Sequence, residues 1–194
     1  MSDDHRHAPP AVPQRVLRAP GLLLRPFVPS DTDAFVAAVR ESASSVGRWM
    51  PWCHAGYSVD EARTWFGHCA RGWALDGDLE FGLFADDGVT LLGGAGLNQF
   101  NLDHNFCNLG YWVRSEAQRQ GVATRAARAL AAHALGALGQ TRVEIVMAAG
   151  NTASEGVARR LGAQCEGVAR NRLVIGLTPV PAHVYALLPG DLAD

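Results

Sequence analysis

The segment LGYWVRSEAQRQGVAT, residues 109–124, decides the fold of this chain. A short apolar run ends at Val113, polar residues follow, and Gly121 opens a long stretch without proline. This order predicts a strand, a turn and then a helix. The first amides of a helix have no intrahelical partner, and with the helix dipole they form an anion site that suits a pyrophosphate. The segment therefore predicts a phosphate-binding junction between strand and helix, with a water-binding helix entrance as the alternative.

Two familiar phosphate-binding motifs are absent from the sequence. All 17 basic residues are arginine, so the chain has no Walker lysine and no lysine nucleophile or base. It also lacks G-x-G-x-x-G, which disfavours a dinucleotide-binding Rossmann fold. The glycine-rich run Gly93–Gly96 lies inside a strand pattern with no helix after it, so we interpret it as close backbone packing or a bulge.

The composition predicts one globular domain. The chain has 194 residues, 48% hydrophobic, and its net charge of −2 provides no basic field for nucleic acid or an anionic membrane. Residues 1–20 are polar and proline-rich without the apolar region of a signal peptide, so we expect a flexible tail, a single domain over 21–190 and a cytoplasmic location. The four cysteines are widely spaced, which predicts buried thiols rather than a disulfide framework or a metal site.

Hydrophobic periodicity and turn signals predict a mixed, mostly antiparallel α/β sheet flanked by about four helices. Ser58 and Glu61 have the spacing of a capping box, Ser30 is a candidate N-cap, and Asp87-Gly88 between apolar runs predicts a hairpin. The expected strands are Leu22–Phe27, Phe81–Ala85, Thr90–Leu97, Cys107–Val113, Arg142–Ala148, Arg170–Leu177 and His183–Leu188. The expected helices start near residues 30 and 58 and span Gly121–Leu138 and Thr152–Leu161.

Gln118, Gly121 and Ala123 match the Q/R-x-x-G-x-G/A motif of the GNAT acetyltransferases. Further segments that match are LLLRP at 22–26, WMPW at 49–52, LGYWV at 109–113, NTAS at 151–154 and LG at 161–162. Over roughly residues 21–188 the chain therefore resembles this family, and within it the RimJ/RimL-type ribosomal-protein N-terminal acetyltransferases. The resemblance implies a GNAT fold and transfer of an acetyl group from acetyl-CoA, without a metal, to a primary amine.

The resemblance also implies the residues of the donor site. The pyrophosphate of acetyl-CoA is expected on the motif, at Gln118, Arg119, Gln120, Gly121, Val122, Ala123 and Thr124. The pantetheine arm is expected along the backbone of Trp112 and Val113, in a V-shaped gap between the strands Cys107–Val113 and Arg142–Ala148. The Val113 amide would donate to the thioester oxygen, Asn151 would bind the pantetheine arm, and Ser154 would give a proton to the departing thiolate.

Asn151 and Ser154 also have a purely structural interpretation. Thr152 and Glu155 have the spacing of a capping box, which makes Thr152 the expected N-cap of the following helix. In that case Asn151 and Ser154 are helix-start residues and nothing more.

Asn108 departs from the pattern of the family. Many relatives carry a glutamate here that serves as the general base or positions a water for it, and asparagine cannot accept a proton. Candidates for the role are Glu80, Asp103 and His104, each of which also fits a solvated loop or strand end. An α-amine with a pKa near ~8 needs a base less than a lysine side chain at ~10.4 does, so the vacancy favours a peptide N-terminus as acceptor.

Trp49 and Trp52 flank Met50 and Pro51, and together they predict an apolar wall of the acceptor site or a plug at the edge of the core. With Asn108 they are the expected acceptor-binding residues. We expect acetylation of a protein N-terminal α-amine, in particular that of a ribosomal protein. The alternatives are acetylation of a small amine metabolite or antibiotic, and a CoA-binding domain without catalysis. A homodimer is compatible with the sequence.

Overall fold

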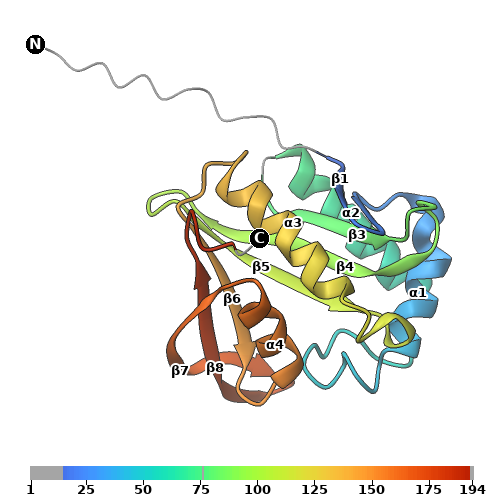
Figure 1. Cartoon of the computed structure of the whole chain (residues 1–194). Coiled ribbons are helices and arrows are strands. Elements are labelled where there is room, and N and C mark those ends of the chain that lie inside the picture. The colour runs from blue at the N-terminus through green and yellow to red at the C-terminus, as the bar shows by residue number, and fades with distance from the viewer. Residues whose placement is uncertain (1–14, 76, 193–194) are drawn as a thin grey trace, which may run out of the picture.

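The strands of the chain form one eight-stranded sheet in the order β1-β2-β3-β4-β5-β6-β8-β7 (Figure 1), within residues 15–75 and 77–192, which the computed structural model describes. Neighbouring strands are antiparallel except β5 and β6, which are parallel. The strands are β1 Leu17–Ala19, β2 Leu22–Arg25, β3 Leu79–Phe84, β4 Leu91–Asn101, β5 Phe106–Val113, β6 Arg142–Ala148, β7 Gln164–Ile175 and β8 Thr178–Leu187. The helices are α1 Thr32–Glu41, α2 Val59–Ala74, α3 Val122–Leu135 and α4 Thr152–Arg160, with short 3-10 turns at Pro29–Asp31 and Ser115–Ala117. The predicted mixed, mostly antiparallel fold is confirmed.

Two hydrophobic clusters cover the two faces of the sheet. On one face α3 and α4 pack over the strands, as Figure 1 shows, through small and branched side chains such as Ala126, Leu130 and Val157. On the other face α1 and α2 pack through an aromatic cluster that includes Phe35, Phe66 and Phe84. The sheet is thus the central layer, and its two faces differ in the kind of residue that they bury.

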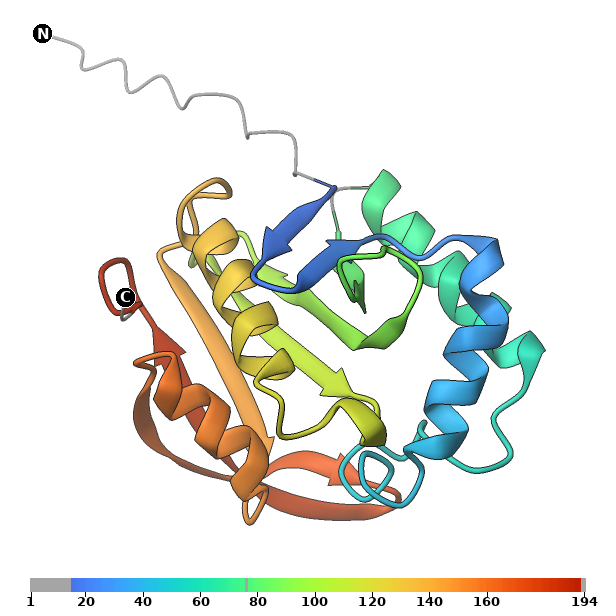
Figure 2. The ribbon, with the colours of Figure 1, turned by 45° about the vertical axis from the view of Figure 1, so that its right-hand side comes forward.

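The parallel pair β5–β6 is joined only at its beginning. The register pairs Phe106 with Arg142, Cys107 with Val143 and Asn108 with Glu144, and β6 then continues with β8 as its partner. Figure 2 shows the two strands diverging beyond that point. This is the predicted V-shaped gap between them, and it leaves the second half of β5 with a free edge.

Several local predictions are confirmed. Ser58 caps α2, because its hydroxyl accepts the Glu61 amide while the Glu61 carboxylate accepts the Ser58 amide. Asp87 closes the β3–β4 turn through its carboxylate, which accepts hydrogen bonds from the Val89 and Thr90 amides at 2.9 Å. The side-chain chemistry of these turns is local, and so the sequence was enough to place them.

Other local predictions are wrong. Ser30 lies inside the 3-10 turn, and α1 begins after Asp31, whose carboxylate binds Arg25 and the Val28 amide. The expected tail contains β1, which pairs with β2, so the sheet begins at Leu17; the rest of that prediction, residues 1–14, lies outside the described residues. Cys165 is exposed, unlike the other three cysteines, because β7 is an edge strand with most of its residues in solvent.

Candidate active site

The free edge of β5 presents the main chain of alternate residues. The Arg114 amide donates to the Leu92 carbonyl of β4 at 2.9 Å. Because main-chain groups alternate in direction along an antiparallel strand, those of Trp112 also point at β4, where Trp112 is paired with Gly94. Those of Tyr111 and Val113 point into the gap. The expectation for the Trp112 backbone is therefore corrected: its amide and carbonyl belong to the sheet, and Tyr111 takes its place beside Val113.

Gln118 has a structural task at this edge. Its side-chain amide donates to the Val113 carbonyl at 3.0 Å and to Ser45 Oγ at 3.2 Å. The Val113 carbonyl is thus engaged within the protein, while the Val113 amide is directed at the gap. Gln118 therefore fixes the end of β5 at which the Val113 amide points into the gap.

The turn before α3 has the backbone of an anion site. Arg119 (φ 60°) and Gly121 (φ 74°) both adopt the left-handed conformation, and such turns gather successive amides into a concave cradle. The first hydrogen bond of the helix runs from the Arg125 amide to the Gly121 carbonyl at 3.0 Å, so the amides before it have no helical partner. The turn over residues 119–124 therefore suits a pyrophosphate, as the motif predicts.

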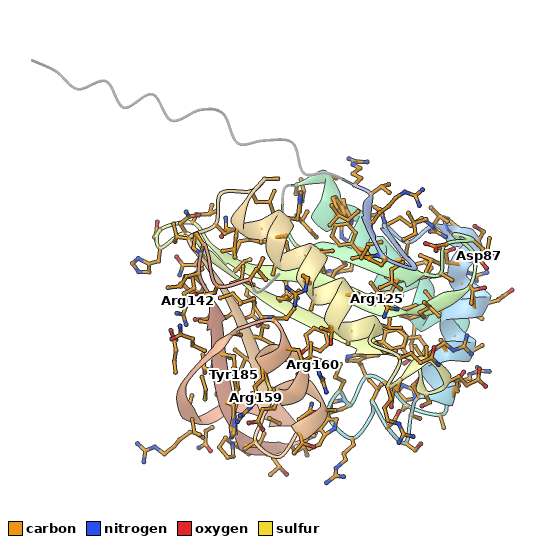
Figure 3. All side chains as sticks on the ribbon, in the orientation of Figure 1. Asp87, Arg125, Arg142, Arg159, Arg160 and Tyr185 are labelled. Carbon is orange, nitrogen blue, oxygen red and sulfur yellow. The ribbon has the colours of Figure 1, made fainter. Side chains whose placement is uncertain are left out.

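Arg125 adds a charge to this cradle. Its Nη1 donates to the Gln120 carbonyl at 2.8 Å and lies 2.9 Å from where a Cβ on Gly121 would be. Figure 3 labels Arg125 on α3. The Arg125 Nε is buried and has no hydrogen-bond partner in the part of the chain that the structure describes. An unsatisfied guanidinium donor beside a row of helix-start amides is the arrangement that a phosphate group would complete.

The cradle is tied to α1 by a polar network. The Glu41 carboxylate binds the Arg114 guanidinium and accepts the Glu116 amide at 2.9 Å, and the Arg114 hydrogen bond holds the pKa of Glu41 below its usual value. Ser42 Oγ accepts the Ser115 amide at 3.1 Å. The loop between β5 and α3 is thereby held against the end of α1 before any ligand binds.

Ser154 lies at the start of α4, opposite Tyr111 of β5. The two hydroxyl oxygens are 3.0 Å apart, and the Tyr111 hydroxyl also lies 3.2 Å from the Ser154 carbonyl. Burial raises the pKa of Tyr111 to about 12, so its phenol stays protonated at neutral pH and can donate. The phenol was missed in the sequence, because only the fold brings the second half of β5 beside α4.

Asn151, not Thr152, is the N-cap of α4. The Asn151 Oδ1 accepts the Ser154 amide at 3.2 Å. The predicted capping box does not form, because the Glu155 carboxylate binds Arg159 and accepts the Tyr185 hydroxyl at 3.0 Å instead. The capping interpretation thus holds for Asn151, while the hydroxyl of Ser154 points to Tyr111.

An aromatic pocket of about 340 Å³ lies on the α1–α2 face of the sheet, against β5. Trp52 packs edge-on against Trp112 with their ring centroids 5.6 Å apart, and Trp112 meets Phe35 in the same way at 5.7 Å. The pocket is lined by Phe27, Phe35, Met50, Trp52, Tyr57, Trp65, Glu80, Phe81, Gly94, Ala95, Asn98, Gly110, Tyr111 and Trp112. Trp49 lies outside this lining, 4.0 Å from the Cβ position of Gly150.

Glycines make room for the pocket floor. Gly94 is opposite Trp112, and a Cβ there would lie 2.6 Å from the indole nitrogen. A Cβ on Gly96 would overlap the carboxylate of Glu80, its partner on β3. The expectation of close packing in the glycine-rich run is confirmed, and a bulge is present as well, since the β3–β4 register shifts between Leu83 and Phe84.

Glu80 is the only one of the three candidate bases that lines the pocket. Its Oε1 accepts Asn98 Nδ2 at 3.1 Å, and Asn98 Oδ1 accepts Asn108 Nδ2 at 2.9 Å. Burial raises the pKa of Glu80 to about 7, with Asp78 adding to the rise and the Asn98 hydrogen bond opposing it. Asn108, expected at the acceptor, is not among the lining residues; its Nδ2 binds Asn98 and lies 4.0 Å from the Cβ position of Gly110, and both of those residues line the pocket.

Asp103 and His104 lie in the turn between β4 and β5, where the His104 amide donates to Asn101 Oδ1 at 2.8 Å. Neither belongs to the residues that line the pocket. Both fit the solvated-loop interpretation.

A family model described as the acetyltransferase (GNAT) domain matches residues 21–164. The chain belongs to the GNAT acetyltransferase family. This GNAT protein is accordingly an N-acetyltransferase, as its sequence motif indicates. The matched region contains the cradle, the free edge of β5 and the aromatic pocket.

Individual relatives point in the same direction. The "Putative ribosomal N-acetyltransferase YdaF" of Bacillus subtilis (strain 168) is 28% identical over 168 residues, 86% of this chain and 91% of that protein. A solved structure from Vibrio cholerae, described as a putative ribosomal-protein-serine acetyltransferase, is 29% identical with a TM-score of 0.80, covering 92% of this chain and 99% of the other. The Mycobacterium smegmatis RimJ structure, solved with CoA-disulfide, has a TM-score of 0.84 at 21% identity, and the match covers 95% of this chain and 92% of the other.

Within residues 15–75 and 77–192, no group of three or more histidine, cysteine or acidic side chains is placed to hold a metal ion. No helix in the same ranges is long and apolar enough to cross a membrane.

Proposed function

We propose that this GNAT enzyme acetylates the N-terminal α-amine of a protein, with a ribosomal protein as the expected acceptor. The amine attacks the acetyl group of acetyl-CoA directly, in a ternary complex. The observation that carries the proposal is the junction of two sites at β5. The free main-chain edge at Tyr111 and Val113 adjoins a pocket lined by Gly110, Tyr111 and Trp112, so donor and acceptor can meet there.

The donor half is supported by the fit between the turn before α3 and a pyrophosphate. The amides over residues 119–124, at the positive end of the α3 dipole, would hold it, and Arg125 Nε would find the acceptor that it lacks in the described part of the chain. The main-chain groups of Tyr111 and the amide of Val113 would pair with the pantetheine arm as an added strand does. Asn151, at the mouth of the gap, stays a prediction for the same arm.

The chemistry of transfer needs a donor for the carbonyl oxygen and a proton for the leaving sulfur. The Val113 amide, held by the sheet and by Gln118 at the adjacent carbonyl, is preorganised to donate to the developing oxyanion. Ser154 Oγ would give a proton to the thiolate. The Tyr111 hydroxyl, 3.0 Å from Ser154 Oγ, would then donate to the seryl oxygen, replace that proton and take one from solvent in turn.

The acceptor half is supported by the pocket and by the relatives. The aromatic rings that line the pocket suit the apolar part of a first residue. Similarity to proteins named as ribosomal-protein acetyltransferases favours an N-terminus over a lysine side chain. We place the reaction in the cytoplasm, where ribosomal proteins are made, and a homodimer stays compatible with the proposal.

The enclosed volume of the pocket favours a second candidate, because about 340 Å³ also accommodates a small aromatic or apolar amine. Acetyl-CoA-dependent thiol release, with mass spectrometry of the products, separates the two. The acceptors are peptides with a free N-terminus, the same peptides N-blocked but containing a lysine, and a panel of small amines. We expect turnover on the free N-termini. Turnover on small amines alone would refute the protein acceptor, and CoA binding without any turnover would indicate a non-catalytic domain.

A further inference from the structure

We propose that Glu80 is the general base of acetyl transfer, acting from β3, two strands away from β5. Asn98 and Asn108 would hold its carboxylate in place. The proposal rests on the N-acetyltransferase activity of the family and not on the identity of the acceptor. It assigns the base to a strand whose sequence carries no motif for it.

The register of the sheet brings the Glu80 carboxylate toward β5. Glu80 is paired with Gly96 of β4, and Gly96 is paired with Gly110 of β5. The carboxylate lies over Gly96, with Oε1 2.6 Å from the place that a Cβ would occupy. Directly opposed residues of this pair type are about 5.5 Å apart between Cα atoms, so the carboxylate is about one strand spacing from Gly110. The space between them belongs to the pocket.

The space between the Glu80 carboxylate and β5 is open because Gly96 and Gly110 have no side chains. With any other residue at position 96, the carboxylate would be displaced from the floor of the pocket. A Cβ on Gly110 would lie 3.9 Å from Asn98 Nδ2, in ordinary contact, so that position has room for an acceptor nitrogen. Two glycines thus connect a carboxylate on β3 with Gly110 of β5, three residues before Val113, where the acetyl group is expected.

The two asparagines orient the carboxylate. Asn108 Nδ2 donates to Asn98 Oδ1, which fixes the amide of Asn98 with its Nδ2 toward Glu80 Oε1. The hydrogen bond occupies Oε1 and leaves Oε2 to receive a proton. Asn108 stands where many relatives have their glutamate, and here it positions a carboxylate that comes from elsewhere in the sheet.

The proposed step balances in atoms and charge. The neutral amine attacks the thioester carbon, the C–N bond forms, and Glu80 Oε2 accepts a proton from that nitrogen. The C–S bond then breaks, and the sulfur takes a proton from Ser154 Oγ. Glu80 releases its proton to solvent and Ser154 regains one through Tyr111, so one amide and one thiol are formed from one amine and one thioester.

The surroundings of Glu80 poise it near neutral pH. Burial is the main cause of its raised pKa, and Asp78 is the charged neighbour that adds to the rise. His68 of α2 lies 4.0 Å from Asp78. On the α2 side the Cys69 thiol, with a pKa of about 12, stays neutral. The other titratable groups that line the pocket are Tyr57 and Tyr111, whose pKa values of about 12 keep them neutral as well. A carboxylate with a pKa of about 7 is therefore half ionised at physiological pH, which suits a general base.

Glu80→Gln tests the proposal, because it keeps the size of the side chain and a hydrogen bond to Asn98. We expect kcat at pH 7 to fall about 10²–10³-fold, with unchanged CoA affinity by calorimetry. The wild-type rate should have an acidic limb near pH 7 that the variant lacks. Asp78→Asn is the matched control: it removes the neighbouring carboxylate, so the acidic limb should persist and shift to lower pH.

Two measurements keep the test independent of the acceptor and of folding. Gly96→Ala retains Glu80 but displaces its carboxylate, and should lower kcat in the same direction. The unfolding midpoints of wild type and Glu80→Gln, compared at pH 5 and pH 8, report the ionisation of this partly buried carboxyl without any substrate. If Glu80→Gln keeps the rate and the acidic limb, the proposal is wrong although the acetyltransferase stands. If only small amines are acetylated, the proposed protein acceptor is wrong, and the role of Glu80 can still be tested with those amines. If no amine is acetylated, both the proposed function and the role of Glu80 are wrong.

Discussion

Gly121→Glu is expected to abolish most of the CoA affinity by placing a carboxylate inside the anion cradle. Gly121 is left-handed at φ 74°, a conformation that costs other residues about 1–2 kcal/mol. Gly139, at φ 65° in open space after α3, carries the same backbone cost. It lies beyond the opposite end of a 14-residue helix, about 20 Å from the cradle. Gly139→Glu is thus a matched control for strain and net charge.

The electrostatic part of the effect can be estimated from the position of the new side chain. A carboxylate about 5 Å from a pyrophosphate with two charges is repelled by about 2 kcal/mol even at the dielectric constant of water, and by more in a partly buried site. Arg125, whose Nη1 lies 2.9 Å from the Cβ position, would neutralise part of that charge. We therefore expect Kd for CoA to rise by about 30-fold or more.

Isothermal titration calorimetry measures the Kd for CoA of wild type and of both variants, at low and at moderate salt. Gly139→Glu should bind as wild type does, and thermal unfolding should show a similar loss of stability in both variants. The reasoning is refuted if Gly121→Glu binds CoA as tightly as wild type, or if the two variants weaken binding equally.

Three further predictions concern catalysis and pH. Ser154→Ala should lower kcat about 10²-fold in steady-state kinetics, with little change in stability because Asn151 caps the backbone amide at that position. Tyr111→Phe should have a smaller effect of the same kind, and an unchanged kcat in both variants would leave Ser154 a helix-start residue. Asn108→Glu adds a second carboxylate beside Asn98, so it should raise the pKa of Glu80 and move the acidic limb of the rate to higher pH. A gain of activity toward high-pKa amines would instead indicate that the new carboxylate at position 108 acts as the base. The folded-state pKa of Glu80, about 7 against 4.5, means that the native state binds more protons than the unfolded chain over this window, so wild-type stability falls as pH rises through it. Glu80→Gln removes that loss, so it should be more stable than wild type at pH 8, by on the order of 3 kcal/mol, and equally stable near pH 4. Equal free energies of unfolding in denaturant at pH 8 would contradict the ionisation of Glu80 in the folded protein.

The edges of the sheet show why some elements were harder to predict than others. β6 was placed without error, because its alternation of buried and partly buried residues carries a clear signal. β7 was predicted to begin six residues too late, since most of its side chains are exposed and leave no pattern of burial. β1 has three residues and was taken for part of the tail. Strand signals weaken wherever a strand buries little.

The sequence by itself determined the donor half of this protein. The motif from Gln118 to Ala123, the glycine at the left-handed position and the unpaired amides of the helix start are all encoded in neighbouring residues, and so is the chemistry that they offer a pyrophosphate. Only the tertiary structure decided which side chains meet as candidates for proton transfer. Glu80 meets Asn98, and Tyr111 meets Ser154, across 18 and 43 positions of the chain. Such contacts depend on strand register and on the packing of helices over the sheet, which are set by burial of the whole core and not by any local pattern.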